Sequence, residues 1–227
     1  ALGEREARAV ADGEALVLKG TPAGFVIAGK DREFREARAE LVGKTAVAVW
    51  SDDVLVPDPI WPQMYACLVA AGASPVRVPL HASLGWRFDA DELARLLTPK
   101  TKGIYLNSPH NPTGGVLTAG DMSRVAELAR AHNLWVIADE AYEDVVFDGT
   151  KHVSLASYPG MHERTLSMFT FSKTYAITGV RLGYLVVKAK NMQDRVRKLI
   201  GLTTNNVSSV IQYGGIGRKT MTISIPT

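Results

Sequence analysis

Short apolar runs alternate with amphipathic stretches along the chain from Asp53 onward. Short apolar runs bounded by turn residues are typical of buried strands, whereas apolar residues three and four positions apart are typical of helices. Strands are predicted on this basis over residues 54–56, 75–78, 103–106, 135–138, 166–170 and 183–187. Helices are predicted over residues 65–71, 90–97, 119–132 and 191–200, with Asp89 and Thr118 as N-caps.

This alternation predicts an α/β domain with a mostly parallel sheet flanked by helices. In such sheets, ligands bind outside the carboxyl ends of the strands. Polar motifs follow several of the predicted strands, so a site is expected at the carboxyl edge of the sheet.

The composition is that of a folded globular protein. Hydrophobic residues make up 46% and charged residues 22% of the 227 residues, which excludes a disordered or low-complexity chain. The formal net charge is +3 and the basic residues are scattered, so no nucleic-acid partner is expected. The histidines show no metal-ligand spacing and are expected to be structural or solvated, so no metal site is predicted.

Cysteine usage and hydropathy favour a cytoplasmic location. Cys67 is the only cysteine, which fits a reducing compartment, and its place on a predicted helix favours burial. No apolar run approaches the roughly 20 residues of a membrane span, and the first residues show no signal-peptide pattern. A cytoplasmic protein without a membrane partner is therefore expected.

The segment around Lys173 combines groups that suit an aldehyde and a phosphate. Lys173 lies between Ser172 and Thr174, and Arg181 follows eight residues later. A lysine amine can form a Schiff base with an aldehyde, while arginine and hydroxyl groups, here also Thr170, donate to phosphate oxygens. Singly, a lysine or an arginine is more often a solvated surface residue. Their conjunction favours a cofactor that is both an aldehyde and a phosphate ester.

Other candidate residues follow predicted strands. Asp139 ends the apolar run 134–138, and a carboxylate there can keep a ring nitrogen protonated, although a structural cap is the commoner role of a lone aspartate. Residues 110–114, His-Asn-Pro-Thr-Gly, would by themselves be a turn. Trp61, beside prolines, would by itself be a core tryptophan.

Residues 169–184, with Asn-Pro-Thr-Gly at 111–114 and Asp-Glu-Ala-Tyr at 139–142, resemble motifs of the class I/II aminotransferases, which are fold-type I pyridoxal-phosphate (PLP) enzymes. The motifs occur in the family's order and at its approximate spacings. The resemblance implies that the chain is the PLP-binding large domain of that fold and lacks most of the small domain. The implied site residues are catalytic Lys173, Asp139 and Tyr142, and cofactor-binding Lys173, Trp61, Asn111, Asp139, Tyr142, Thr170, Ser172 and Arg181.

The resemblance implies a role for each residue that meets the cofactor ring. Lys173 would hold PLP as an internal aldimine, and Asp139 would pair with the ring nitrogen. Tyr142 and Asn111 would bond to the ring hydroxyl oxygen. The peptide bond between Asn111 and Pro112 is expected to be cis, although only about 5–6% of X–Pro bonds are.

The remaining residues would meet the ring face and the phosphate. Trp61 would stack on the ring, and Thr170, Ser172 and Arg181 would hold the phosphate. Relatives add a turn of glycine and small residues whose backbone N–H groups bind the phosphate. This sequence has no counterpart of that turn between residues 41 and 52.

The resemblance covers residues 53–215, with a weaker patch at 24–41. It divides the chain into a partial N-terminal segment (1–52), the PLP-binding large domain (53–215) and an unmatched tail (216–227). Relatives also carry a small-domain arginine for the substrate carboxylate, which has no counterpart here. We expect the sequence to be incomplete or joined across missing segments, and an intact protein mass equal to that of these 227 residues would refute this.

The implied activity is ping-pong transamination between an L-amino acid and a 2-oxo acid, with Lys173 as cofactor anchor and proton shuttle. The same residues would serve other reactions on this fold, such as carbon–sulfur β-lysis or amino-acid cyclisation. Release of pyruvate without an oxo-acid acceptor would indicate a lyase. A catalytically degenerate PLP-binding regulatory domain is a further alternative, favoured by the missing phosphate turn. Fold analogy also implies a homodimer.

Overall fold

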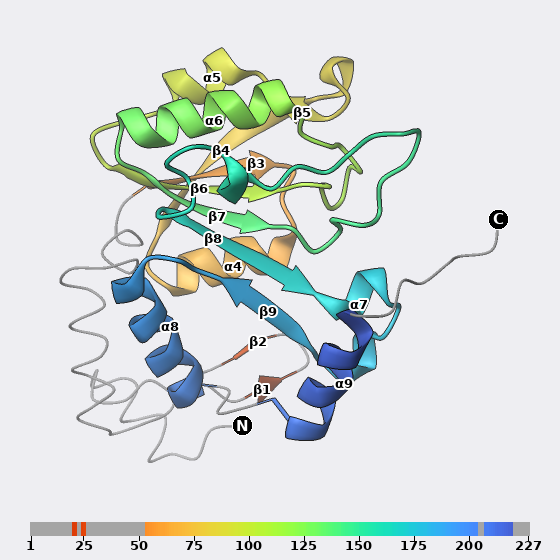
Figure 1. Cartoon of the computed structure of the whole chain (residues 1–227). Helices are drawn as coiled ribbons and strands as arrows, with labels where there is room; N and C mark the ends of the chain where they lie inside the picture. Colours follow the sequence, from red (N-terminus) through yellow and green to blue (C-terminus); the bar gives the residue numbers. More distant parts are fainter. Residues whose placement is uncertain (1–19, 22–23, 26–52, 204–206, 220–227) are drawn as a thin grey trace.

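A seven-stranded sheet forms the centre of the molecule (Figure 1). The computed structural model describes residues 20–21, 24–25, 53–203 and 207–219. The strand order is β5-β4-β3-β6-β7-β8-β9, and β1 (Gly20–Thr21) pairs separately with β2 (Gly24–Phe25). The strands of the large sheet are β3 (Asp53–Asp58), β4 (Ser74–His81), β5 (Arg87–Phe88), β6 (Thr101–Asn107), β7 (Trp135–Asp139), β8 (Thr165–Thr170) and β9 (Gly183–Val186).

Helices connect most of these strands. The α-helices are α4 (Pro62–Ala70), α5 (Ala90–Arg95), α6 (Ala119–Ala131), α7 (Phe171–Thr174), α8 (Lys190–Thr203) and α9 (Ser209–Lys219). Short 3₁₀ turns lie at Ala82–Leu84, Leu155–Ser157 and Thr178–Val180.

The sheet is mostly parallel, as predicted. Strands β4, β3, β6, β7 and β8 run parallel to one another, while β5 and β9 pair antiparallel at the two edges. Each predicted strand overlaps an observed one. The pattern does not predict β5, because two residues show no alternation, or α9, where Gly214 and Gly215 weaken the helical signal.

Both predicted N-caps are confirmed. The Asp89 carboxylate accepts hydrogen bonds from two backbone N–H groups in the first turn of α5. Thr118 and Asp121 form a capping box at the start of α6. Helix α4 begins at Pro62, earlier than predicted, because the fixed φ of proline suits the first helical position.

Alternate residues of the strands pack into two separate cores. Leu55 and Val136 pack with residues of α5 and α6 on one face of the sheet. Val54 and Tyr105 pack with Leu68 of α4 on the other face, and Figure 1 shows these helices on opposite sides. Since side chains alternate along a strand, the two cores follow directly from the strand pattern.

The predicted burial of Cys67 is wrong. Leu68 is the buried residue of α4, and Cys67 is exposed. Met64 and Tyr65 of this helix pack against the same core as Leu68, whereas Cys67 is not among the residues of that core.

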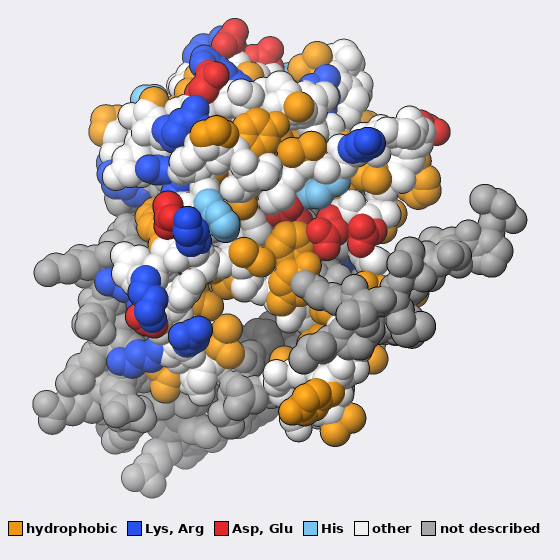
Figure 2. All heavy atoms as spheres, viewed as in Figure 1, with side chains coloured by type: hydrophobic (Ala, Val, Ile, Leu, Met, Phe, Trp, Pro, Cys, Tyr) orange, Lys and Arg blue, Asp and Glu red, His pale blue; other side chains and the backbone are white. Residues whose placement is uncertain are grey.

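The predicted segment 1–52 lies outside the described residues except for β1 and β2, and so does the stretch in which a phosphate-binding turn is expected. Residues 220–227 of the predicted tail also lie outside them. In the described ranges, no helix is long and apolar enough to cross a membrane. On the face shown in Figure 2, Lys and Arg side chains lie in several separate groups, some of them beside acidic side chains.

Candidate active site

A cavity of about 400 Å³ opens at the carboxyl ends of β6, β7 and β8, beside the start of α4. All the side chains that the sequence singles out for cofactor binding line it, namely Trp61, Asn111, Asp139, Tyr142, Thr170, Ser172, Lys173 and Arg181. They come from segments more than a hundred residues apart in sequence, which the parallel sheet brings to one edge. The structure therefore brings the residues together, while their roles stay predictions.

Asp139 is the last residue of β7 and lies opposite Asn107 of β6. Its Oδ2 accepts a hydrogen bond from the Tyr105 hydroxyl at 2.8 Å, and its Oδ1 accepts one from the backbone N–H of Ala141 at 3.2 Å. Burial raises the pKa of the Asp139 carboxyl above its ordinary value, and the bond from Tyr105 opposes that rise.

Asn107 links the backbones that carry two of the predicted residues. Its Nδ2 donates to the backbone carbonyl of Asp139 at 3.1 Å, and its Oδ1 accepts from the backbone N–H of Asn111 at 2.7 Å. The peptide bond between Asn111 and Pro112 is cis, as predicted. Asn107 thus fixes the start of this turn against the end of β7.

Asn111 and Tyr142 meet at the cavity. The Asn111 amide donates to the Tyr142 hydroxyl over 3.3 Å. The Lys173 amine lies over the Tyr142 ring, 5.3 Å from its centre, where a cation is attracted to the ring face. We call Asp139, Asn111 and Tyr142 the strand wall of the cavity.

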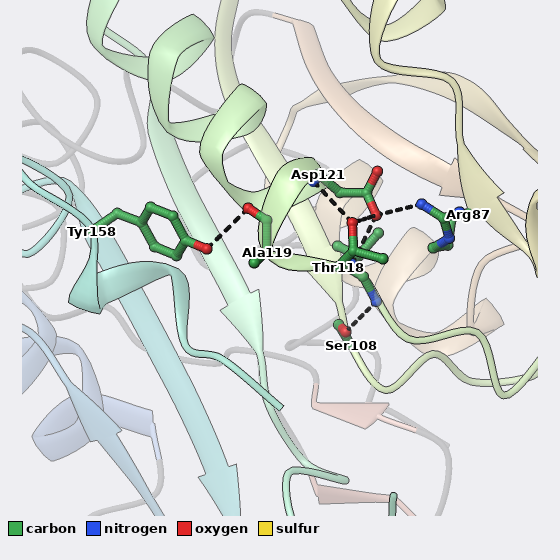
Figure 3. Close-up of polar contacts among 7 residues, drawn as sticks. Arg87, Ser108, Thr118, Ala119, Asp121 and Tyr158 are labelled. Atoms are coloured by element: carbon green, nitrogen blue, oxygen red, sulfur yellow. Dashed lines mark hydrogen bonds and ion pairs between the residues drawn. The ribbon is translucent and has the colours of Figure 1, made fainter. Parts of the chain in front are cut away.

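The turn that carries Asn111 is held at its far end by the start of α6 (Figure 3). Ser108 accepts a hydrogen bond from the backbone N–H of Leu117 at 3.0 Å. Asp121 accepts from the backbone N–H of Thr118 and from Arg87 of β5, both at 2.7 Å. The turn is therefore fixed at both ends, by Asn107 and by the capping box.

The opposite wall comes from the segment between β8 and β9. Thr170 is the N-cap of α7, and its hydroxyl accepts from the backbone N–H of Ser172 at 3.1 Å and donates to the Leu182 carbonyl at 3.3 Å. Lys173 is the third residue after this cap, and it is exposed. Arg181 is also exposed, has a left-handed backbone (φ 57°), and donates to the Thr178 carbonyl at 2.8 Å.

We call Thr170, Ser172, Lys173 and Arg181 the hairpin wall, because β8 and β9 pair antiparallel around them. Trp61 closes the cavity at a third side. It directly precedes α4 and is 40% exposed, so it is a cavity-lining side chain rather than a core tryptophan.

Another group of polar side chains lies behind the strand wall. The Glu140 carboxylate, 3% exposed, lies 2.7 Å from His152 Nε2 and accepts from the Ser154 hydroxyl at 2.9 Å. These contacts join the two ends of the loop that carries Tyr142. The sequence pattern gives no signal for them, and it gives none for the contact of Tyr105 with Asp139.

The fold and this cavity define the class of protein. The family described as aminotransferase class I and II matches residues 36–214, and the chain belongs to this family. Its members are PLP-dependent, which agrees with the expected cofactor.

The comparisons also identify particular relatives. The chain is 41% identical over 157 residues to aromatic-amino-acid aminotransferase 2 of Thermococcus litoralis, covering 69% of this chain and 40% of that protein. It is 45% identical over 135 residues to an arginine–pyruvate transaminase of Pseudomonas aeruginosa, covering 60% and 34%. An aromatic aminotransferase structure from Pyrococcus horikoshii matches with a TM-score of 0.73 and 31% identity, covering 96% and 63%. The matched part thus spans about two fifths of the first relative's length.

The donor set of the cavity fits PLP. Asp139 is the only acidic residue among the described ones that line it, so the cavity offers one carboxylate for a ring nitrogen and no second acid to repel a phosphate. An amine, a guanidinium and two hydroxyls stand in the hairpin wall. This arrangement has a matching polar group for each polar part of the cofactor.

Proposed function

We propose that the protein is an aminotransferase that binds PLP in this cavity and transfers an amino group between an L-amino acid and a 2-oxo acid in a ping-pong mechanism. The observation that carries the proposal is the shared cavity of Lys173, Asp139, Asn111, Tyr142 and Arg181. Membership of the family supports the class of reaction, and the names of the relatives support amino-acid substrates.

When bound, PLP supplies an aldehyde and an electron-withdrawing ring that makes the α-proton of an amino acid acidic. Asp139 would hold a proton on the ring nitrogen, because a half-buried carboxylate beside a cationic ring forms a strong charge-assisted hydrogen bond. Its bonds from Tyr105 and Ala141 keep that carboxylate in place.

Lys173 would anchor the cofactor and then carry the proton that is removed from the substrate. Among the described residues it forms no ion pair with a carboxylate, and its amine lies over the Tyr142 ring. An amine at the end of a flexible side chain, held near a ring rather than by an acid, can deliver and accept a proton over a short distance.

The other side chains would position the cofactor. The Asn111 and Tyr142 pair offers donors to the ring hydroxyl oxygen, and Trp61 offers a flat face at the cavity rim. Thr170, Ser172 and Arg181 would bind the phosphate through hydroxyl and guanidinium donors. Fold analogy also leads us to propose a homodimer, and the single cysteine supports a cytoplasmic location.

A half-reaction assay tests the proposal. The purified protein is incubated with PLP and separately with panels of L-amino acids and 2-oxo acids, and the visible spectrum and the products are recorded. Conversion of a donor amino acid to its 2-oxo acid, followed by recovery of the starting spectrum with an acceptor, is expected. Release of pyruvate without an acceptor would instead identify a lyase, and binding of PLP without turnover would identify a regulatory domain.

A further inference from the structure

Tyr105 lies behind Asp139 in a position that the established motifs do not include. It precedes Asn107 by two residues on β6, so both side chains lie on the same face of the sheet. Tyr105 is 1% exposed, and its ring packs in the core with Val56 and Ile60. The ring is therefore fixed by packing, while its hydroxyl reaches Asp139 Oδ2 at 2.8 Å.

The groups around Asp139 shift the pKa of its carboxyl in opposite directions. Burial and the nearby charge of Glu140 raise the pKa of Asp139, while the hydrogen bonds from Tyr105 and Ala141 and the charge of Lys173 lower it. In the described part of the chain, the side-chain group that donates a hydrogen bond to this carboxylate is the Tyr105 hydroxyl. Burial also raises the pKa of Tyr105, so its hydroxyl stays protonated and remains a donor.

The two oxygens of Asp139 are thus held differently. Oδ2 faces the Tyr105 hydroxyl, and Oδ1 faces the backbone N–H of Ala141, which belongs to the cavity lining. With both oxygens bonded, the carboxylate plane cannot turn without breaking a bond. A hydrogen bond to an ionised group is stronger than one between neutral groups, so these two bonds favour the anion and oppose the effect of burial.

We propose that Tyr105 is a positioning residue that keeps the Asp139 carboxylate ionised and in one orientation at the cavity. The inference rests on the proposed function, in which Asp139 holds the proton of the cofactor's ring nitrogen. Tyr105 itself does not line this cavity. It acts through Asp139 alone.

Binding of PLP to matched variants gives the first test. Tyr105→Phe keeps the buried ring and removes the hydroxyl. Tyr158→Phe is the control, since its hydroxyl donates to the Ala119 carbonyl at 3.0 Å and Tyr158 does not line the cavity (Figure 3). We expect Tyr105→Phe to weaken PLP binding about tenfold, because a hydrogen bond to a charged group is lost, and Tyr158→Phe to leave it unchanged.

Tyr105→Phe in an Asp139→Asn background shows whether Tyr105 affects PLP binding through the Asp139 carboxylate or through packing of its ring. If Tyr105 acts through the carboxylate, Tyr105→Phe has little further effect on PLP binding once that carboxylate is absent. An equal loss in both backgrounds would overturn the proposal, and so would wild-type binding by Tyr105→Phe.

Unfolding of the cofactor-free protein gives a second test that does not depend on PLP. The pKa of Asp139 in the folded protein lies above the unfolded value of 3.8. The stabilising contribution of this carboxyl to the free energy of unfolding is therefore fully present below pH 3.8 and is lost as the pH rises through the folded pKa. Removing the Tyr105 hydroxyl raises the folded pKa further. The unfolding constants of wild type and Tyr105→Phe should therefore differ little near pH 3 and diverge about tenfold toward neutral pH.

The pH-dependent divergence should disappear in the Asp139→Asn background. A divergence that is independent of pH, or that persists without the carboxylate, would contradict the proposed role of Tyr105. If wild-type protein failed to bind PLP, the proposed function would fail, while these unfolding measurements would still decide whether Tyr105 keeps Asp139 ionised.

Discussion

The strand wall and the hairpin wall of the cavity hold their polar groups in different ways. In the strand wall, Asp139 is bonded to Tyr105, and Asn111 is bonded to Tyr142. In the hairpin wall, Lys173 and Arg181 are exposed, and the recorded hydrogen bond of the Arg181 side chain goes to a backbone carbonyl of its own segment.

The difference indicates a division of labour between fixed and movable groups. Groups that hold a ring in one plane benefit from being placed before the ligand arrives, because no reorganisation is then needed. An amine that carries a proton must instead change its contacts during the reaction. We expect substitutions in the strand wall and behind it to change stability, in some cases together with binding, and substitutions in the hairpin wall to change binding and rate with little change in stability.

Replacement of Lys173 by alanine should give the largest effect. In the proposed mechanism this variant would lack both the cofactor anchor and the proton carrier, so the half-reaction should slow by about 10³-fold or more, and the visible absorbance of the lysine-bound cofactor should disappear. Stopped-flow absorbance with excess donor measures the rate. Lys188→Ala is the control, because Lys188 pairs with Glu163 at 2.9 Å on the surface. Persistence of both signals in Lys173→Ala would contradict the assigned role.

Glu140→Ala should reduce stability more than any change in the hairpin wall. It leaves His152 and Ser154 without their buried partner, and we expect the free energy of unfolding to fall by about 3 kcal/mol. Urea titration of the cofactor-free protein measures it. Glu127→Ala removes an exposed carboxylate paired with Arg124 and should cost less than about 0.5 kcal/mol. Equal losses would show that the buried group does not brace the loop.

Arg181→Ala should weaken PLP binding with little change in stability. Loss of a guanidinium donor to a phosphate is expected to reduce the affinity about tenfold. Arg130→Ala is a matched control, since Arg130 also donates to a backbone carbonyl at 2.8 Å but does not line the cavity. Equilibrium dialysis with PLP compares the two variants. Equal affinities would show that Arg181 does not bind the phosphate.

Thr118→Ala should have the smallest effect. It breaks the capping box that ends the turn carrying Asn111 (Figure 3), and the free energy of unfolding should fall by about 1 kcal/mol. Because Asn107 still holds Asn111 from the other side, PLP affinity should stay within about twofold of wild type. A larger loss of affinity would mean that the strand wall depends on α6.

Much of the fold is predictable from the sequence because its signals are local. Strand β7 is an apolar run that ends at a polar residue, and α6 begins at a threonine cap, so both can be recognised without knowing their neighbours. Asn111, Asp139 and Lys173 likewise lie at or within a few residues of the carboxyl ends of strands. Parallel pairing then brings them to one edge.

The supporting contacts are not predictable in the same way. Tyr105 meets Asp139 because Tyr105 pairs with Ile137 and both strands keep this register to their ends, a fact that no local pattern contains. Glu140 and His152 meet across an irregular loop whose path has no periodicity. The exposure of Cys67 depends on which side of α4 meets the sheet, and a short helix with apolar residues around its circumference does not specify that side.

The antiparallel pairing of β8 with β9 makes the hairpin wall a segment of small sequence separation. Thr170 pairs with Gly183, where an added Cβ would lie 2.7 Å from the Phe169 carbonyl oxygen, so the backbones can approach only with glycine there. Contacts close in sequence form with a smaller loss of chain entropy than distant ones. Pulse-labelled hydrogen exchange should therefore show protection in this hairpin before Asp139 meets Tyr105, 34 residues away. The segment that carries the exposed Lys173 and Arg181 side chains would then be the first to acquire its backbone shape.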